Sequence, residues 1–336
     1  MARIFSGIQP TGRKHLGNYI GAIRPYVDWQ DRGEGIYCIV DLHATTVAYE
    51  PVALRASLYD LTALLLAAGL EPGRCILFRQ SDVPEHTELS WLLTSVTGYG
   101  ELQRMTQFKD KAGRQELVSV GLFTYPVLMA ADVLAYRAGI VPVGEDQRQH
   151  IELMRNVADR FNGRFGDRLV VPEGVYPEIG ARIMDLQEPT RKMSTTSPSP
   201  QGTVFVLDEP EAILKKFRSA VTDSDREIRH GTDKPGVSNL LEILAVVEST
   251  NLPALEERFQ GAGYGDLKRA VGEAVVGYLA PVRERYSFLR ADETGLEAIL
   301  ADGADRAREI AAGTLAEVRE AMGVGPLRAP GATGRA

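Results

Sequence analysis

The sequence predicts an α/β protein: a Rossmann-type doubly wound parallel sheet followed by a C-terminal helical domain. Strand patterns alternate with helical patterns through residues 1–200. Residues 35–41 and 75–80 are almost continuously apolar, which is typical of parallel strands buried on both faces. From about Pro210 onwards helical patterns dominate, so we expect an all-helical second domain there.

Length and composition indicate an ordinary globular protein of one large or two medium domains. The chain has 336 residues, of which 44% are apolar and 25% charged. Its net charge of −7 argues against indiscriminate nucleic-acid binding, but permits an RNA partner on a local basic face. Cys38 and Cys75 lie in apolar runs, as core residues of a reducing compartment do. With no signal-peptide pattern and no apolar run of membrane-spanning length, we expect a cytoplasmic protein without a membrane partner.

The first element is a strand–turn–helix unit over residues 4–21. A β-prone run ends at the turn Pro10–Gly12, and a helical pattern begins at Gly17. A helix N-terminus presents free N–H groups and partial positive charge, which suits a phosphate. His15 and Asn18 add hydrogen-bonding groups at that position. The alternative is a plain turn without a ligand, since neither G-x-G-x-x-G nor the P-loop pattern is present.

The remaining elements follow from apolar periodicity and from Gly and Pro at their ends. Pro51 and Gly69 bracket one helix. Pro25 interrupts the first helix, and we expect a kink there, well behind the binding site. Strands are expected over 35–41, 75–80, 140–143 and 182–185, and helices over 51–69, 86–97, 125–136, 148–161, 210–220, 238–247, 266–289 and 304–322.

His43 follows the second predicted strand. In doubly wound sheets, ligands bind beyond the carboxyl ends of the strands. We therefore expect His43 at the ligand edge, either in contact with substrate or as a structural residue. The polar segment 107–115 is predicted to be a loop, read from composition alone as a solvated connection.

The helix over 125–136 carries one chemically unusual residue. Tyr125, Met129, Asp132 and Tyr136 recur at i, i+4, i+7 and i+11, so they share a face. A carboxylate on an apolar face needs a hydrogen-bond partner. That partner is either an Arg or backbone N–H of the protein, or a ligand donor such as an indole N–H.

Gly144, Glu145 and Asp146 precede the helix over 148–161. Acidic residues at a helix start usually serve as caps. Gly144 would leave room for a ribose against the backbone.

A loop rich in Ser, Thr and Pro follows the strand predicted at 182–185. It is either a flexible interdomain linker or a cluster of donors that clamps a departing pyrophosphate. The donors are Arg191, Lys192, Ser194, Thr195 and Thr196.

Several of these stretches resemble signatures of class I aminoacyl-tRNA synthetases. His15–Asn18 is similar to the HIGH signature and Lys192–Ser194 to the KMSKS loop. The chain resembles bacterial tryptophanyl-tRNA synthetases over nearly its full length, with only the tail 325–336 unmatched. The matching stretches are 5–21, 39–45, 101–108, 125–132, 140–153 and 192–194.

The resemblance implies activation of L-tryptophan by ATP to tryptophanyl-adenylate and pyrophosphate, then transfer to the terminal adenosine of tRNA(Trp). It implies a catalytic domain over 1–200 with a helical insert at 105–175, an anticodon-binding domain over 201–324, and a disordered tail over 325–336. It also implies a homodimer, and Mg²⁺ that arrives with ATP without a dedicated protein site.

The resemblance also implies roles for individual residues. Catalytic roles fall to Gln9, His15, Lys111, Lys192 and Ser194. ATP would be bound by Gln9, Pro10, Thr11, Gly17, Asn18, Gly144, Glu145, Asp146, Ile183, Lys192, Met193, Ser194, Thr195 and Thr196. Tryptophan would be bound by Phe5, His43, Tyr125, Met129, Asp132, Val141, Val143 and Gln147. The chain departs from the pattern at Thr195, where the signature has its second lysine, and at Thr196, where it has its final serine; Lys192, Lys111 or Arg191 would have to compensate for the lost cation.

Three alternatives remain open from the residues. A tyrosyl-tRNA synthetase must satisfy a phenol that donates and accepts, whereas an ionised Asp132 only accepts. A nucleotidyltransferase acting on a small carboxylate would not need the helical region after Pro210. A non-catalytic paralogue that binds tryptophan or another protein has Thr195 as its only support.

Overall fold

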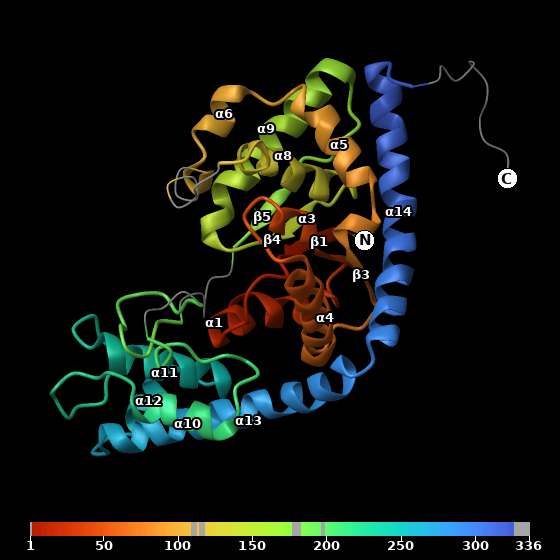
Figure 1. The fold of residues 1–336 in the computed structure, drawn as a ribbon. Helices are drawn as coiled ribbons and strands as arrows, with labels where there is room; N and C mark the ends of the chain where they lie inside the picture. The colour runs from red at the N-terminus through yellow and green to blue at the C-terminus, as the bar shows by residue number, and fades with distance from the viewer. Residues whose placement is uncertain (1, 109–112, 114–117, 177–182, 196–198, 326–336) are drawn as a thin grey trace.

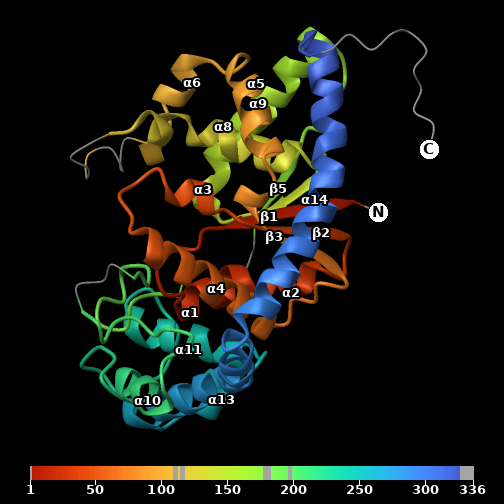
Figure 2. The same cartoon turned by 45° about the vertical axis from the view of Figure 1, so that its right-hand side comes forward.

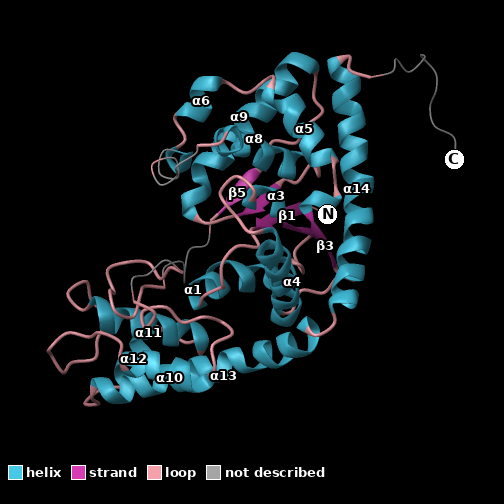
Figure 3. Cartoon of the chain, in the orientation of Figure 1, coloured by secondary structure: helices cyan, strands magenta, loops and turns pink. Residues whose placement is uncertain are grey.

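The structure is a computed structural model that describes residues 2–108, 113, 118–176, 183–195 and 199–325. Five parallel strands form one sheet in the order β3-β2-β1-β4-β5, which confirms the predicted doubly wound α/β class. The strands lie at the centre of a mainly helical molecule (Figure 3). They are β1 (Arg3–Ile8), β2 (Glu34–Ile39), β3 (Cys75–Arg79), β4 (Ile140–Pro142) and β5 (Glu173–Val175).

Most predicted helices are present with shifted ends. The α-helices are α1 (Leu16–Asn18), α2 (Arg24–Trp29), α3 (Asp41–Ala44), α4 (Pro51–Ala68), α5 (Glu85–Thr94), α6 (Tyr99–Gln103), α8 (Val120–Leu134), α9 (Arg148–Phe165), α10 (Pro210–Arg218), α11 (Pro235–Val247), α12 (Leu252–Arg258), α13 (Tyr264–Arg290) and α14 (Glu293–Met322). Short helical turns are η1 (Tyr19–Ile23), η2 (Gln80–Asp82) and η3 (Glu145–Gln147).

The prediction of a strand at 182–185 is wrong for residues 183–185, the part of it that the structure describes. There the chain makes a single bridge between Met184 and Lys192 and does not join the sheet. The sequence did not indicate β5, α6 or α12, because three to seven residues carry too little periodic signal.

The apolar run of β2 separates two layers of core. Tyr37 and Ile39 face the layer that contains α2 and α4. Ile36 and Cys38 face the layer that contains α5, α8 and α9. Because alternate side chains of a strand point to opposite faces, both faces of this strand are buried, as its composition predicts. Helices lie on both sides of the sheet (Figures 1 and 2).

The C-terminal helices lie partly in a small helical unit and partly on the sheet. Figure 1 shows α13 beside α10 and α11, while α14 runs back along the β3 edge. Gly303 permits this approach, since a Cβ there would collide with the Leu77 carbonyl oxygen.

The domain boundary near residue 200 stays a prediction. The tail 326–336, Lys111 and Thr196 lie outside the described residues.

Pro25 ends a π-helical turn. The turn η1 is closed by the Arg24 N–H, which donates to the Tyr19 carbonyl, and Pro25, which has no N–H, follows directly. The expectation that this break lies well behind the binding site was wrong, because Pro25 lines the main cavity described below.

Helix α4 corrects the expectation that no apolar run has membrane-spanning length. Its 18 residues are long and apolar enough to cross a membrane, judged by length and composition only. Half of this helix is buried inside the structure, and Leu61, Leu64 and Leu65 pack in the core. Cys38 and Cys75 are both buried and free.

Candidate active site

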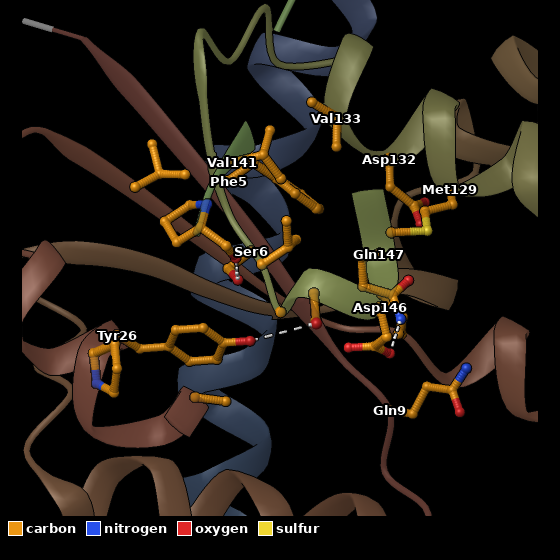
Figure 4. A pocket seen from close by; sticks show the side chains of 18 of the residues that line it. Phe5, Ser6, Gln9, Tyr26, Met129, Asp132, Val133, Val141, Asp146 and Gln147 are labelled. Atoms are coloured by element: carbon orange, nitrogen blue, oxygen red, sulfur yellow. Dashed lines mark hydrogen bonds between the residues drawn. The ribbon is translucent and has the colours of Figure 1, made fainter. Parts of the chain in front are cut away.

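One cavity of about 560 Å³ lies beyond the carboxyl ends of β1, β2 and β4. This is the edge at which ligands bind in doubly wound sheets. In Figure 4, Asp132 and Met129 lie on one side of the cavity and Tyr26 on the other. The residues predicted to bind substrate or ATP that line it are Phe5, Gln9, His43, Tyr125, Met129, Asp132, Val141, Val143, Gly144, Asp146 and Gln147.

Asp132 is fully engaged with the protein on one oxygen. Its Oδ1 accepts from Gln80 Nε2 at 2.6 Å and lies 2.6 Å from His86 Nδ1. Its Oδ2 lies 2.8 Å from His43 Nε2. The protein partner left open by the sequence is therefore neither an Arg nor a backbone N–H, but two histidines and a glutamine.

The charge of Asp132 follows from this environment. Burial alone would raise the pKa of the carboxyl group, but the interactions with His43 and the hydrogen bond from His86 outweigh it and hold the pKa well below its usual range. A carboxylate offers about four acceptor positions, and the three donors leave one. Asp132 lines the cavity, so a ligand donor can use that position.

Tyr125 and Gln147 line the same cavity. The Tyr125 hydroxyl lies 2.9 Å from His150 Nε2 and donates to Gln107 Oε1 at 3.3 Å. Burial raises the pKa of Tyr125 to about 12, so the phenol keeps its proton. Gln147 Nε2 donates to Asp146 Oδ2 at 2.7 Å, which orients its Oε1 as an acceptor.

Gly144 lines the cavity, beside the side chain of Asp146. A Cβ at Gly144 would lie 2.7 Å from Asp146 Oδ1, and the expected ribose contact stays a prediction. Glu145 is exposed and pairs with Arg148 at 2.8 Å. Glu145 does not line the cavity.

The turn before α1 is built by His15 and Asn18. The Asn18 N–H donates to His15 Nδ1, and the His15 N–H donates to Asn18 Oδ1, each at 3.2 Å. Burial, and then the charges of Lys192 and Lys14, lowers the pKa of His15 to about 4. The ring is therefore neutral near pH 7. Because Nδ1 accepts, its proton is on Nε2, which can donate to a phosphate oxygen.

The loop with Lys192–Ser194 packs beside this turn. Met193 is buried, and its N–H donates to the Ile183 carbonyl at 3.0 Å. Because the Met193 side chain is buried, it anchors this loop, and its predicted contact with ATP stays a prediction. A Cβ at Gly17 would lie 3.4 Å from Ile183 Cβ, and one at Gly12 would lie 3.8 Å from Thr195 Cγ2. The structure thus brings the two predicted phosphate-binding segments together.

The compensating cations differ in availability. Arg191 forms a salt bridge with Glu188 at 2.8 Å. Lys192 is exposed, and it makes no ion pair with any residue that the structure describes. The role predicted for Lys111 stays a prediction.

Several residues that shape the site were missed from the sequence. Gln80 and His86 follow β3, and both reach Asp132. The rule that ligands gather at strand ends would have pointed to them, as it did to His43. Tyr26 and Trp29 of α2 and Arg32, which follows this helix, also line the cavity, and the sequence analysis did not single them out.

Comparison with known proteins identifies the family of this chain. Residues 1–280 match the family model of class I tRNA synthetases (W and Y). The chain is 51% identical over 330 residues to tryptophan–tRNA ligase 2 of Streptomyces avermitilis, covering 97% of this chain and 98% of that one. It is 50% identical over 335 residues to the tryptophan–tRNA ligase of Mycobacterium leprae, covering 97% and 98%.

Solved structures show the same relationship. Tryptophanyl-tRNA synthetase from Mycoplasma pneumoniae superposes with a TM-score of 0.89 at 38% identity, covering 97% of this chain and 98% of that one. The Campylobacter jejuni enzyme, solved with ADP and tryptophan, gives 0.82 at 33% identity, covering 96% and 100%. The chain therefore belongs to the class I tRNA synthetase family that includes the tryptophan and tyrosine enzymes.

Proposed function

We propose that this protein is a tryptophan–tRNA ligase that makes tryptophanyl-adenylate from L-tryptophan and ATP, then charges tRNA(Trp). The supporting observation is that tryptophan-binding residues predicted from separate segments line one cavity beyond the strand ends. The similarity to tryptophan–tRNA ligases over nearly the whole chain supports the same choice.

The amino acid would lie between α8 and β4. Its indole N–H would donate to the remaining acceptor position of Asp132, beside Met129, Val141 and Val143. Tyr125 and the Gln147 Oε1 would accept from the ammonium group. This orientation aims the carboxylate at the HIGH-like turn, where the α-phosphate would be bound.

ATP would lie across the turn before α1. Gln9, His15 Nε2–H and the backbone near Gly17 would hold the phosphates, and Asp146 and the Ile183 backbone the nucleoside. A tryptophan carboxylate oxygen attacks the α-phosphorus, and the bond from that phosphorus to the bridging oxygen breaks. Pyrophosphate leaves with the electron pair, stabilised by Lys192 and Ser194. Positioning and electrostatics suffice for this chemistry.

Mg²⁺ would enter on the phosphate oxygens of ATP and neutralise part of their charge. Across the described ranges, no group of three or more His, Cys, Asp or Glu side chains is arranged to hold a metal ion. Oxygen ligands from a nucleotide suit this ion.

The second step would transfer tryptophan to the 2′-hydroxyl of the terminal adenosine of tRNA(Trp). The helical unit of α10, α11 and α13 is the proposed anticodon reader. This reaction, and the two free cysteines, favour the cytoplasm as its location.

A homodimer would cover an exposed apolar surface. Trp91 on α5, Tyr99 on α6 and Val120 on α8 are 77%, 69% and 77% exposed, on helices that pack together. We expect Trp91→Glu to convert a dimer to a monomer in size-exclusion chromatography with light scattering, because a buried unpaired charge is costly. Phe288→Glu is the matched control, since Phe288 is 81% exposed on α13. Equal dimerisation by both variants would exclude Trp91 from the interface.

Exchange of labelled pyrophosphate into ATP tests the proposed function. Exchange should require L-tryptophan, and tRNA(Trp) should then be charged. Exchange with tyrosine instead would indicate a tyrosyl enzyme. Exchange without charging would indicate a nucleotidyltransferase, and no exchange a non-catalytic paralogue.

Thr195→Lys should be tolerated and should raise the exchange rate. The side chain of Thr195 is exposed and faces the Gly12 turn, so a lysine ammonium there can reach the phosphate site. Steady-state exchange at varied ATP measures the effect, with Thr195→Met as the uncharged control. A sharp loss of activity in Thr195→Lys would mean that the loop has repacked around threonine.

A further inference from the structure

The two oxygens of Asp132 face different surroundings. Oδ1 lies with Gln80 and His86, and neither of these residues lines the cavity. Oδ2 lies with His43, which does line it. The acceptor position that remains for a ligand is therefore on Oδ2, and the partners of Oδ1 hold the carboxylate from behind.

Both partners of Oδ1 are themselves oriented. The Leu42 N–H donates to Gln80 Oε1 at 3.1 Å, so the amide nitrogen of Gln80 must point at Asp132. His86 Nε2 lies 2.6 Å from the Tyr136 hydroxyl. His86 and Tyr136 are fully buried.

One proton arrangement satisfies this chain. Asp132 is ionised and only accepts, so His86 Nδ1 carries a proton and donates. His86 Nε2 then accepts from the Tyr136 hydroxyl, and the ring carries one proton. Tyr136 thereby selects the His86 tautomer that presents a donor to Asp132.

We propose that His86, held by Tyr136, is a positioning residue for amino-acid selection. It fixes the plane of the Asp132 carboxylate so that Oδ2 aims its remaining lone pair at the indole N–H. This inference rests on the proposed function. It adds that selectivity against analogues without an N–H depends on a buried pair that never touches the substrate.

The test compares tryptophan with its isostere β-(benzothiophen-3-yl)alanine, in which sulfur replaces the indole N–H. A site built around a hydrogen bond rejects an analogue without the donor by up to about 10⁴. His86→Phe removes the donor to Asp132 and should lower kcat/KM for tryptophan in pyrophosphate exchange by about 10- to 100-fold. The kcat/KM for the isostere should change little, so the ratio of kcat/KM for tryptophan to that for the isostere falls.

His86→Asn is the matched variant. Its amide nitrogen can occupy the place of Nδ1, so the ratio should stay within about threefold of wild type. The KM for ATP should be unchanged in both variants, and thermal unfolding reports any loss of stability. Should His86→Phe fail to fold because the Tyr136 hydroxyl is left unpaired, the double variant with Tyr136→Phe removes that group. Tyr136→Phe alone should lower the ratio less than His86→Phe.

The outcomes are distinguishable. If the variants lose activity equally toward tryptophan and the isostere, the ratio is unchanged, His86 is merely structural, and the inference is overturned. If wild-type protein shows no tryptophan-dependent exchange, the proposed function itself fails. If wild type does not prefer tryptophan over the isostere, Asp132 does not read the N–H, which again overturns the inference.

Discussion

Lys192→Ala is expected to slow tryptophan-dependent pyrophosphate exchange by about 10²–10³, the usual cost of losing a transition-state charge contact. Thr195 leaves the loop without the second lysine of the signature, and Arg191 is engaged by Glu188. The charge of Lys192 reaches the turn before α1, since it helps to lower the pKa of His15. Among the described residues of this loop, Lys192 is therefore the cation that is available to stabilise the leaving pyrophosphate.

The measurement separates rate from binding. Tryptophan affinity, measured by equilibrium dialysis, should stay within about twofold, because the lysine acts on charge that develops in the transition state. Arg191→Ala is the matched control and should lose less than about threefold, since Arg191 pairs with Glu188 and, unlike Lys192, does not contribute to the lowered pKa of His15. Exchange by Lys192→Ala at nearly the wild-type rate would remove Lys192 from the pyrophosphate site.

Asp132→Asn is expected to lower kcat/KM for tryptophan by about 10- to 100-fold, because a hydrogen bond to a charged group is worth roughly 1.5–3 kcal/mol. An amide also turns one acceptor into a donor against Gln80, His86 or His43. The free energy of unfolding should therefore fall by about 1–3 kcal/mol, the cost of one unsatisfied buried group.

Selectivity gives the stronger test of Asp132. Wild-type protein should prefer tryptophan over phenylalanine by up to about 10⁴–10⁵, since phenylalanine leaves the carboxylate position unpaired. Asp132→Ala should lower this ratio, mainly because activity toward tryptophan falls. Pyrophosphate-exchange kinetics with each amino acid measure the ratio.

Asp208→Asn is the control for stability. Asp208 is also a buried carboxylate, paired with Lys216 at 2.6 Å and Arg13 at 3.0 Å, and it does not line the main cavity. The tryptophan-to-phenylalanine selectivity ratio of Asp208→Asn should match that of wild-type protein, although the variant is less stable. An unchanged ratio in Asp132→Ala would mean that Asp132 serves the protein alone.

The sequence by itself determined the local elements and the edge of the sheet at which ligands bind. Continuous apolar runs predicted β2 and β3, and Pro51 with Gly69 predicted both ends of α4. These features follow from periodicity, caps and turn chemistry, which act between residues close in the chain. His43 could be placed at the ligand edge because strand ends of a parallel sheet share one side.

The tertiary structure decided how side chains distant in the sequence meet. Asp132 pairs with residues 46, 52 and 89 positions away, and no periodic pattern reports such a partner. The return of α14 onto β3 depends on the fit of Gly303 to Leu77, more than 200 positions away along the chain. Sequence patterns reveal that a carboxylate is buried and must be paired, because desolvation is a local cost. Which donors pair with it depends on the packing of separate layers, and that is decided only when the chain folds.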